Sequence, residues 1–195
     1  SGGDGGLVLL AASALLEFNG HVDTSAPQGK LGELHLSADS IDVGAGGLAA
    51  AALAAGVGDV TIYATQTVSV DLEGSVLDLG DNSLSVNVVG DAGGGAGLAF
   101  LQLNADDTIR TTGTITITVR DEGVNGDALI DIAGRLEAER EQPLPIPDSP
   151  PGNGNDIALV SQNGRIRLRD SARLRASDGD EGGLVLLHAD GSGDS

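Results

Sequence analysis

The chain has 195 residues and a formal net charge of −19 at pH 7, with 31 glycines, two phenylalanines, one tyrosine and no tryptophan, methionine or cysteine. This charge argues against binding to nucleic acids or anionic membranes, whose phosphates need lysine and arginine, and the lack of cysteine excludes disulfides and thiolate metal sites. Hydrophobic residues still make up 40% of the chain and alternate with polar ones, which favours a folded core of aliphatic side chains over disorder.

Short alternating strands recur at a constant spacing in the first third of the chain. Val8, Leu34 and Val60 each begin such a strand, and they are 26 residues apart (34 − 8 and 60 − 34). The two-residue alternation puts one set of side chains inside and the other in solvent. A repeat this short buries its apolar face only by stacking on further copies. The pattern therefore predicts a solenoid.

Later strands continue the pattern less regularly. We expect the main inward series to continue through the strands that begin at Leu84, Leu101, Ile130, Ile157 and Val185, and a secondary series to include those at Ile41, Val68, Ile115 and Ile166. Glycine, asparagine and aspartate between strands allow corners at positive φ. The prediction is an all-β parallel β-helix of about seven coils, which at a rise of about 4.8 Å per coil is about 35 Å long.

Two segments interrupt the repeat. Residues 44–58 are rich in alanine and glycine and form either a loop or a short helix, while residues 141–155 hold five of the six prolines. Proline lacks the amide hydrogen that a central strand donates, so we expect residues 141–155 to be extruded as a loop. Leu136 and Leu174 occupy equivalent places on either side of it. We therefore expect residues 1–195 to be one β-helix segment. We also expect this segment to belong to a longer chain, because its Gly/Ser/Asp-rich ends resemble corners within the repeat.

No catalytic, cofactor-binding or metal-ligating residue is predicted. Residues 43–49 mimic a dinucleotide-binding turn, but strands rather than helices follow, so no cofactor is expected. The acidic turns at Asp4 and 178–181 resemble calcium-binding corners, yet the tandem nonapeptide is missing, which favours solvated turns. The histidines have no second ligand at metal-binding spacing. The adjacent aspartates Asp106 and Asp107 are predicted to form a turn. No apolar run is long enough to span a bilayer, so no membrane insertion is expected.

A basic cluster near the C-terminal end is the one candidate interaction surface. It comprises half of all lysines and arginines, namely Arg165, Arg167, Arg169, Arg173 and Arg175. With Ile166, Leu168 and Leu174 inward, these side chains project outward, where they form either a docking strip for an anionic partner or ion pairs between coils. The equivalence of Leu136 and Leu174 places Arg175 beside Glu137, which favours ion pairing.

The stretches 164–168, 171–177 and 182–189 resemble the repeats of filamentous-haemagglutinin-type exoproteins of the two-partner secretion family, with an echo at 19–25 and 34–39. The resemblance covers most of the chain except the two interruptions. It implies a long right-handed β-helical rod, exported by a Gram-negative-type bacterium through an outer-membrane partner and displayed or shed as an adhesin. The secretion domain of that family is not evident here, and no functional residues carry over.

The leading hypothesis is a non-enzymatic rod segment of an extracellular adhesin or surface filament. Its partner would be a glycan or protein on a host or neighbouring cell. A carbohydrate-active enzyme, either a polysaccharide lyase or a hydrolase, is the rival, although three aromatic residues make a poor sugar cleft. A self-stacking fibre subunit is the third hypothesis, because the ends of a β-helix expose unpaired strand edges.

Overall fold

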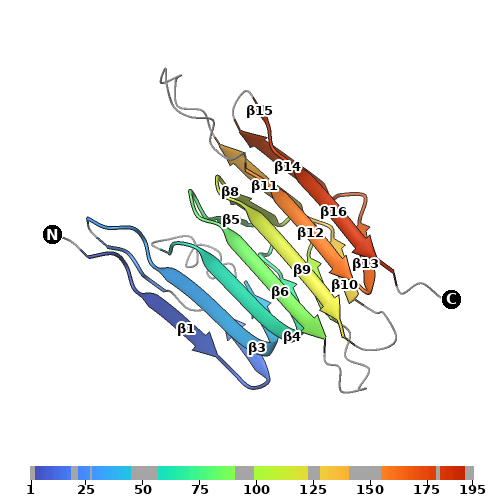
Figure 1. The fold of residues 1–195 in the computed structure, drawn as a ribbon, viewed down its shortest axis with the longest axis horizontal. Coiled ribbons are helices and arrows are strands. Elements are labelled where there is room, and N and C mark those ends of the chain that lie inside the picture. The colour runs from blue at the N-terminus through green and yellow to red at the C-terminus, as the bar shows by residue number, and fades with distance from the viewer. Residues whose placement is uncertain are drawn as a thin grey trace.

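The computed structural model describes residues 3–18, 22–26, 28–44, 57–90, 99–122, 128–140, 155–178 and 181–191. All regular structure in these ranges is β-strand, and almost all strand pairing is parallel (Figure 1). No helix that could cross a membrane occurs in these ranges. The all-β prediction is therefore confirmed for this part of the chain.

The strands lie in three stacks. The first contains β1 (Leu7–Ala11), the first halves of β3 (Glu33–Val43) and β4 (Val60–Val70), β6 (Leu84–Gly90), β9 (Ile115–Asp121), β12 (Ile157–Gln162) and β16 (Val185–Asp190). The second contains β2 (Leu15–Phe18), the second halves of β3 and β4, β7 (Phe100–Leu103), β10 (Ala128–Ile132) and β13 (Gly164–Leu168). The third contains β5 (Val76–Asp78), β8 (Thr108–Thr111), β11 (Arg135–Arg140) and β14 (Arg173–Asp178), with β15 (Glu181–Gly182) antiparallel to β14.

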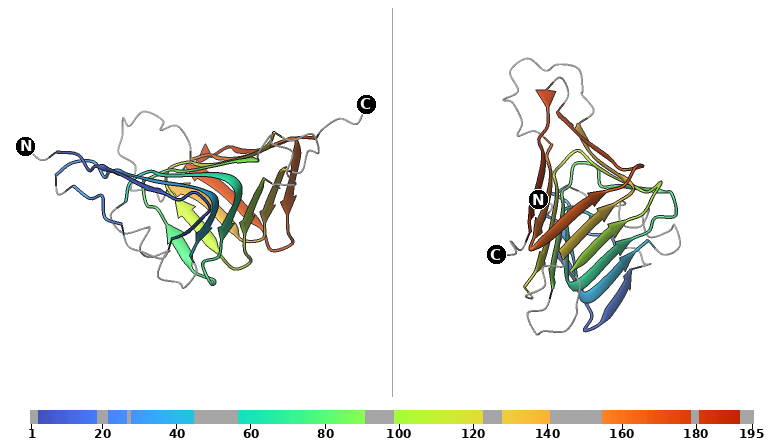
Figure 2. Two further views of the ribbon diagram at one scale, coloured as in Figure 1. Left: turned by 90° about the horizontal axis from the view of Figure 1, so that it is seen from below. Right: turned by 90° about the vertical axis from the view of Figure 1, so that its right-hand side faces the viewer.

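The strands of the three stacks face one another (Figure 2). The buried side chains between them form one apolar cluster. Along β4, β6 and β9, buried residues alternate with more exposed ones, as a pleated strand with one apolar face requires. Ile62, Leu101 and Leu136 come from the first, second and third stacks respectively, and all three line the same small apolar cavity. Parallel strands that pass from stack to stack around a shared interior form a nearly closed, solenoid-like architecture.

The regular part of the predicted register is confirmed. Val8 pairs with Leu34, Leu34 with Val60, and Val60 with Leu84, so these residues form one inward column of the first stack. Across the proline-rich interruption, Leu136 pairs with Leu174 as expected. Aliphatic side chains one coil apart therefore stack on each other, which is what the 26-residue spacing indicated.

The predicted assignment of three later strands is wrong. Leu101 and Ile130 belong to the second stack, where Leu101 pairs with Val68 and with Ile130, whereas Ile115 belongs to the first stack beside Leu84. The reason is the length of the corners: residues 91–98 and 123–127 separate first-stack from second-stack strands in these coils. Extra residues at a corner shift the phase of the repeat without changing the alternation inside a strand.

Two predicted segments fall largely outside the described residues. Of the Ala/Gly-rich segment 44–58, only Gly44, Val57 and Gly58 are described, and of the proline-rich segment 141–155 only Asn155 is. Gly44 has φ +100°, a conformation that favours glycine, so the chain leaves β3 through a left-handed residue. The predictions of a helix or loop in the first segment and of an extruded loop in the second stay predictions.

Replacing Gly164 by alanine is expected to lower the free energy of unfolding by about 1–3 kcal/mol. A Cβ atom at this position would lie 1.9 Å from the backbone oxygen of Ala128 on the neighbouring strand β10, so the two strands would have to separate. Urea denaturation measures the effect. The matched control is Gly182→Ala, because nothing lies within 4 Å of a Cβ built there. Equal losses in both variants would contradict the close approach.

Candidate functional site

The five arginines of the predicted strip lie on two stacks. Arg165 and Arg167 are on β13 of the second stack, Arg169 follows that strand, and Arg173 and Arg175 are on β14 of the third stack. All five side chains are exposed. Their docking role stays a prediction, but their contacts with acidic residues of the preceding coil can be described.

Asp131 on β10 holds two of these arginines. Its carboxylate accepts hydrogen bonds from Arg169 at Oδ1 (Nε, 2.7 Å) and Oδ2 (Nη2, 2.5 Å), and Arg167 Nη1 lies 3.6 Å from Oδ2. Asp131 is only 6% exposed. The hydrogen bonds from Arg169 lower the pKa of Asp131 below its ordinary value, against the opposing effect of burial. This bidentate pair joins one coil to the next.

The outward column of the third stack alternates in charge. Asp78, Arg110, Glu137 and Arg175 pair in that order from β5 to β14. Arg110 Nε donates to Glu137 Oε2 over 3.1 Å, and this hydrogen bond raises the pKa of Arg110. Arg175 lies opposite Glu137, as the sequence predicted, but its Nε makes its ion pair with the carboxylate of Glu139. Opposite charges on neighbouring strands thus stabilise the stack.

Replacing Arg169 by alanine is expected to raise the pKa of Asp131. In the folded protein this pKa is lowered, so the pair contributes stability above the unfolded value of about 3.9, and this stability is lost as pH falls through the folded pKa. Arg169→Ala therefore moves acid unfolding to higher pH. Carboxyl carbon NMR titration of Asp131 measures the shift directly. Arg173→Ala is the control, because Arg173 is not among the groups that lower the pKa of Asp131, and an unchanged Asp131 titration in Arg169→Ala would refute the assignment.

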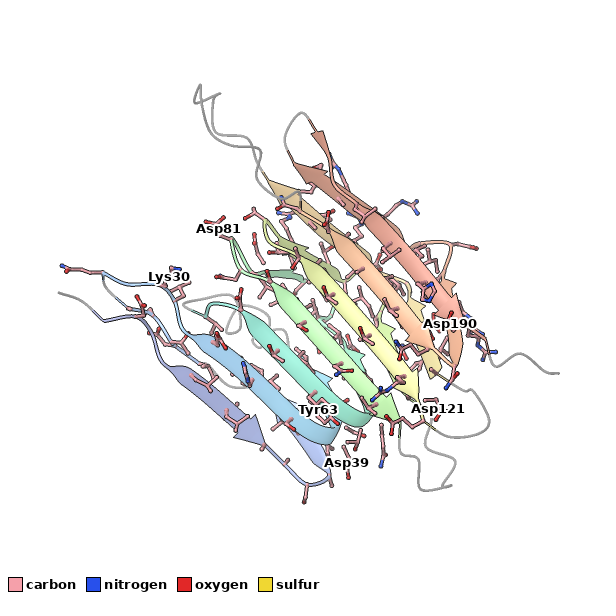
Figure 3. All side chains as sticks on the ribbon, in the orientation of Figure 1. Lys30, Asp39, Tyr63, Asp81, Asp121 and Asp190 are labelled. Carbon is pink, nitrogen blue, oxygen red and sulfur yellow. The ribbon has the colours of Figure 1, made fainter. Side chains whose placement is uncertain are left out.

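A polar groove lies at the corner where the first stack turns into the second. Its volume is about 440 Å³, and it is lined by Asp39, Tyr63, Thr65, Gln66, Val89, Gly90 and Glu122. In Figure 3, Asp39 and Tyr63 lie toward the same end of the first-stack strands. The sequence analysis does not predict this groove. The sequence does contain a signal for the corner, because the alternation of apolar and polar residues is interrupted after Ala38 and after Ala64, where β3 and β4 bend and their register shifts.

Two carboxylates of the groove are held by neighbouring side chains. Thr65 Oγ1 donates a 2.7 Å hydrogen bond to Asp39 Oδ1, which ties the corner of β3 to the corner of β4. Arg120 Nη2 lies 2.6 Å from Glu122 Oε1. Tyr63 projects from the outer face of β4 and is 40% exposed. The groove therefore combines an accessible aromatic ring with oriented hydrogen-bond acceptors.

The described histidines lie outside this groove. His35 Nε2 is 3.0 Å from Glu33 Oε2, and His188 Nε2 is 3.0 Å from Asp190 Oδ1; His21 falls outside the described residues. Within the described ranges, no group of three or more histidine, cysteine, aspartate or glutamate side chains is placed to hold a metal ion. These two histidines are surface residues paired with neighbours on their own strands.

Comparison with known proteins assigns no family to the chain. No family model, curated protein or solved structure matches it. Its function therefore has to be argued from the stacked strands, the arginine pairs and the corner groove.

Proposed function

We propose that this chain is a non-enzymatic rod segment of an extracellular bacterial adhesin or surface filament. The observation that carries the proposal is the single apolar interior shared by three parallel stacks. Each coil buries its aliphatic side chains against the next, and each such side chain contributes roughly 1.5–3 kcal/mol. A structure stabilised in this way needs no ligand or cofactor and lengthens by adding coils, which suits a protein that projects something from a surface.

In its finer form, the proposal is a right-handed parallel β-helix of about seven coils. Right-handed crossovers between parallel strands are strongly preferred because of the twist of the strands. The proline-rich segment 141–155 would be a loop extruded from one coil. Return of the chain to register at Leu136 and Leu174 supports this reading, because the stacking is the same before and after the insertion.

The partners in this proposal follow from the resemblance to filamentous-haemagglutinin-type repeats. An outer-membrane secretion partner would export the chain, and a glycan or protein on a host or neighbouring cell would be its receptor. The charge of −19 favours solubility and mutual repulsion outside the cell. The outward arginines Arg165 and Arg173 would remain available for a receptor, since neither has an ion pair with an acidic side chain among the described residues.

The test combines two measurements on the source bacterium. Negative-stain electron microscopy of the native protein asks whether it forms elongated particles, and mass spectrometry of peptides released by protease from intact cells asks whether it is displayed. Elongated particles together with surface peptides support the proposal. Short particles found only inside the cells would refute it.

A carbohydrate-active enzyme is the second candidate, because Asp39 and Glu122 lie in the same groove. The pair of carboxylates in a glycosidase is normally about 5–9.5 Å apart. Asp39 and Glu122 belong to corners separated by three strand steps, β3 to β4 to β6 to β9, which corresponds to about 14 Å along the stack. That separation disfavours hydrolysis. Release of reducing ends from acidic or neutral polysaccharides, lost in Asp39→Asn, would favour the enzyme.

A further inference from the structure

We infer that the corner groove is a binding site for an uncharged oligosaccharide. The inference rests on the proposed role of the rod as a display scaffold and gives that scaffold a recognition site and a ligand class. It is carried by the shape of the groove, by the exposed ring of Tyr63 and by the acceptors and donors around it.

The groove is elongated along the stack. Its lining comes from four successive first-stack strands: Asp39 from β3, Tyr63 from β4, Gly90 from β6, and Glu122 directly after β9. Four neighbouring strands span about 14 Å. Its volume of about 440 Å³ falls within the range of sites for small organic ligands. A short oligosaccharide lying across the strands fits a site of this form better than a single compact metabolite does.

Tyr63 supplies the apolar surface of the site. On the outer face of the first stack its neighbours are Ser37 on β3 and Asn87 on β6, both small enough to leave the ring accessible. An amphipathic ring offers a flat apolar face and a hydroxyl at its edge. A pyranose ring has the matching chemistry, because its C–H groups form an apolar face and its hydroxyls lie around the rim.

The polar residues match the hydroxyls of such a ligand. Asp39 and Glu122 accept hydrogen bonds, Thr65 accepts through its oxygen because its hydroxyl proton is donated to Asp39, and the Gln66 amide both donates and accepts. Thr65 already fixes one oxygen of Asp39, so part of the site is preorganised. The charge of Glu122 is paired with Arg120, so repulsion of anionic sugars such as uronates comes from Asp39 together with the strongly acidic chain. This repulsion favours an uncharged oligosaccharide over an anionic one.

The test is ligand-detected NMR on the 195-residue chain with four probes. Chitotriose, cellotriose and maltotriose are the uncharged probes, and trigalacturonate is the anionic one. Saturation transfer to at least one uncharged probe is expected, and protein-detected spectra recorded alongside are expected to show chemical-shift changes at Tyr63. Tyr63→Ala is expected to weaken binding about tenfold, while Tyr63→Phe keeps the ring and most of the affinity. Thr118→Ala, on the same outer column two strands away on β9, is the matched control.

The outcomes separate this inference from the proposed function. No transfer to any uncharged probe at about 10 mM, or tighter binding of trigalacturonate, overturns the inference. So does binding that Tyr63→Ala leaves unchanged in a variant whose thermal unfolding matches the parent. Peptides at the cell surface without sugar binding would remove the groove as a site and leave the rod standing. Sugar binding by a protein found only inside cells would support the groove as a binding site and refute the extracellular rod.

Discussion

Replacing Ile117 by alanine is expected to lower the free energy of unfolding by about 2–5 kcal/mol. Ile117 is 1% exposed, lies in the middle of β9 and lines the interior cavity between the three stacks. Its column contains Val86 on β6 and Leu159 on β12. Removing the side chain loses its burial and leaves a void that neighbours held in a regular sheet fill only in part.

Chemical denaturation of Ile117→Ala and of Thr118→Ala measures this effect. Thr118 is the next residue on β9 and points outward, so its replacement is expected to change stability by no more than about 0.5 kcal/mol. The pair compares the two faces of one strand at the same place in the stack. Similar losses from both substitutions would contradict the assignment of the inward face, and with it the shared interior.

Replacing Asp107 by alanine is expected to lower the free energy of unfolding by about 2–4 kcal/mol, since it leaves the backbone amides of buried Leu72 and of Gly74 without their acceptor. Asp107 is fully buried at the corner before β8, and its carboxylate accepts hydrogen bonds from the backbone amides of Leu72 (Oδ2, 2.9 Å) and Gly74 (Oδ1, 2.8 Å). These amides belong to the corner of the preceding coil. The side chain therefore ties two corners together where the strands themselves do not pair.

Two further variants test this role. Asp107→Asn retains one acceptor and is expected to lose about half as much stability, while Asp106→Asn removes the same charge from the exposed neighbour and should be nearly neutral. Asp106 has φ +68°, a conformation that asparagine tolerates. Equal stability of Asp107→Ala and Asp106→Asn in urea denaturation would refute the bridging role.

The protonation of Asp107 makes the free energy of unfolding depend on pH. Burial raises the pKa of Asp107 above its ordinary value and outweighs the two amide hydrogen bonds, which lower it. The folded state then binds more protons than the unfolded state between the ordinary and the raised pKa, so this residue makes stability fall as pH rises through that window. Asp107→Asn should remove that slope. The lowered pKa of Asp131 acts in the opposite direction, at lower pH.

The turn at 106–107 illustrates what local sequence can reveal. The sequence predicted a turn from two adjacent aspartates, and Asp106 does have a positive φ. It gave no sign that Asp107 is buried and bonded to residues 33 and 35 positions earlier. Turn formation is a local property of the backbone, whereas burial of a carboxylate depends on which coil lies above it.

The arginines also show which contacts can be predicted from strand alignment and which depend on the folded structure. Alignment of Leu136 with Leu174 correctly placed Arg175 opposite Glu137. The ion pair nevertheless forms with Glu139, because a long guanidinium side chain reaches diagonal neighbours on the adjacent strand. The sequence does not predict the pairing of Asp131 with Arg167 and Arg169, because the predicted register places the strand of Asp131 in the first stack and that of Arg167 in the second.

The sequence by itself determined that the described part of the chain is all-β, that its strands alternate apolar and polar residues, and that Val8, Leu34 and Val60 share one inward column. These features are encoded within single strands and in a constant spacing. Only the tertiary structure decided which stack receives Leu101, Ile130 and Ile115, and that Asp39, Tyr63 and Glu122 line one groove. The physical reason is that corner length and bending set how strands stack, and stacking brings together residues far apart in the chain.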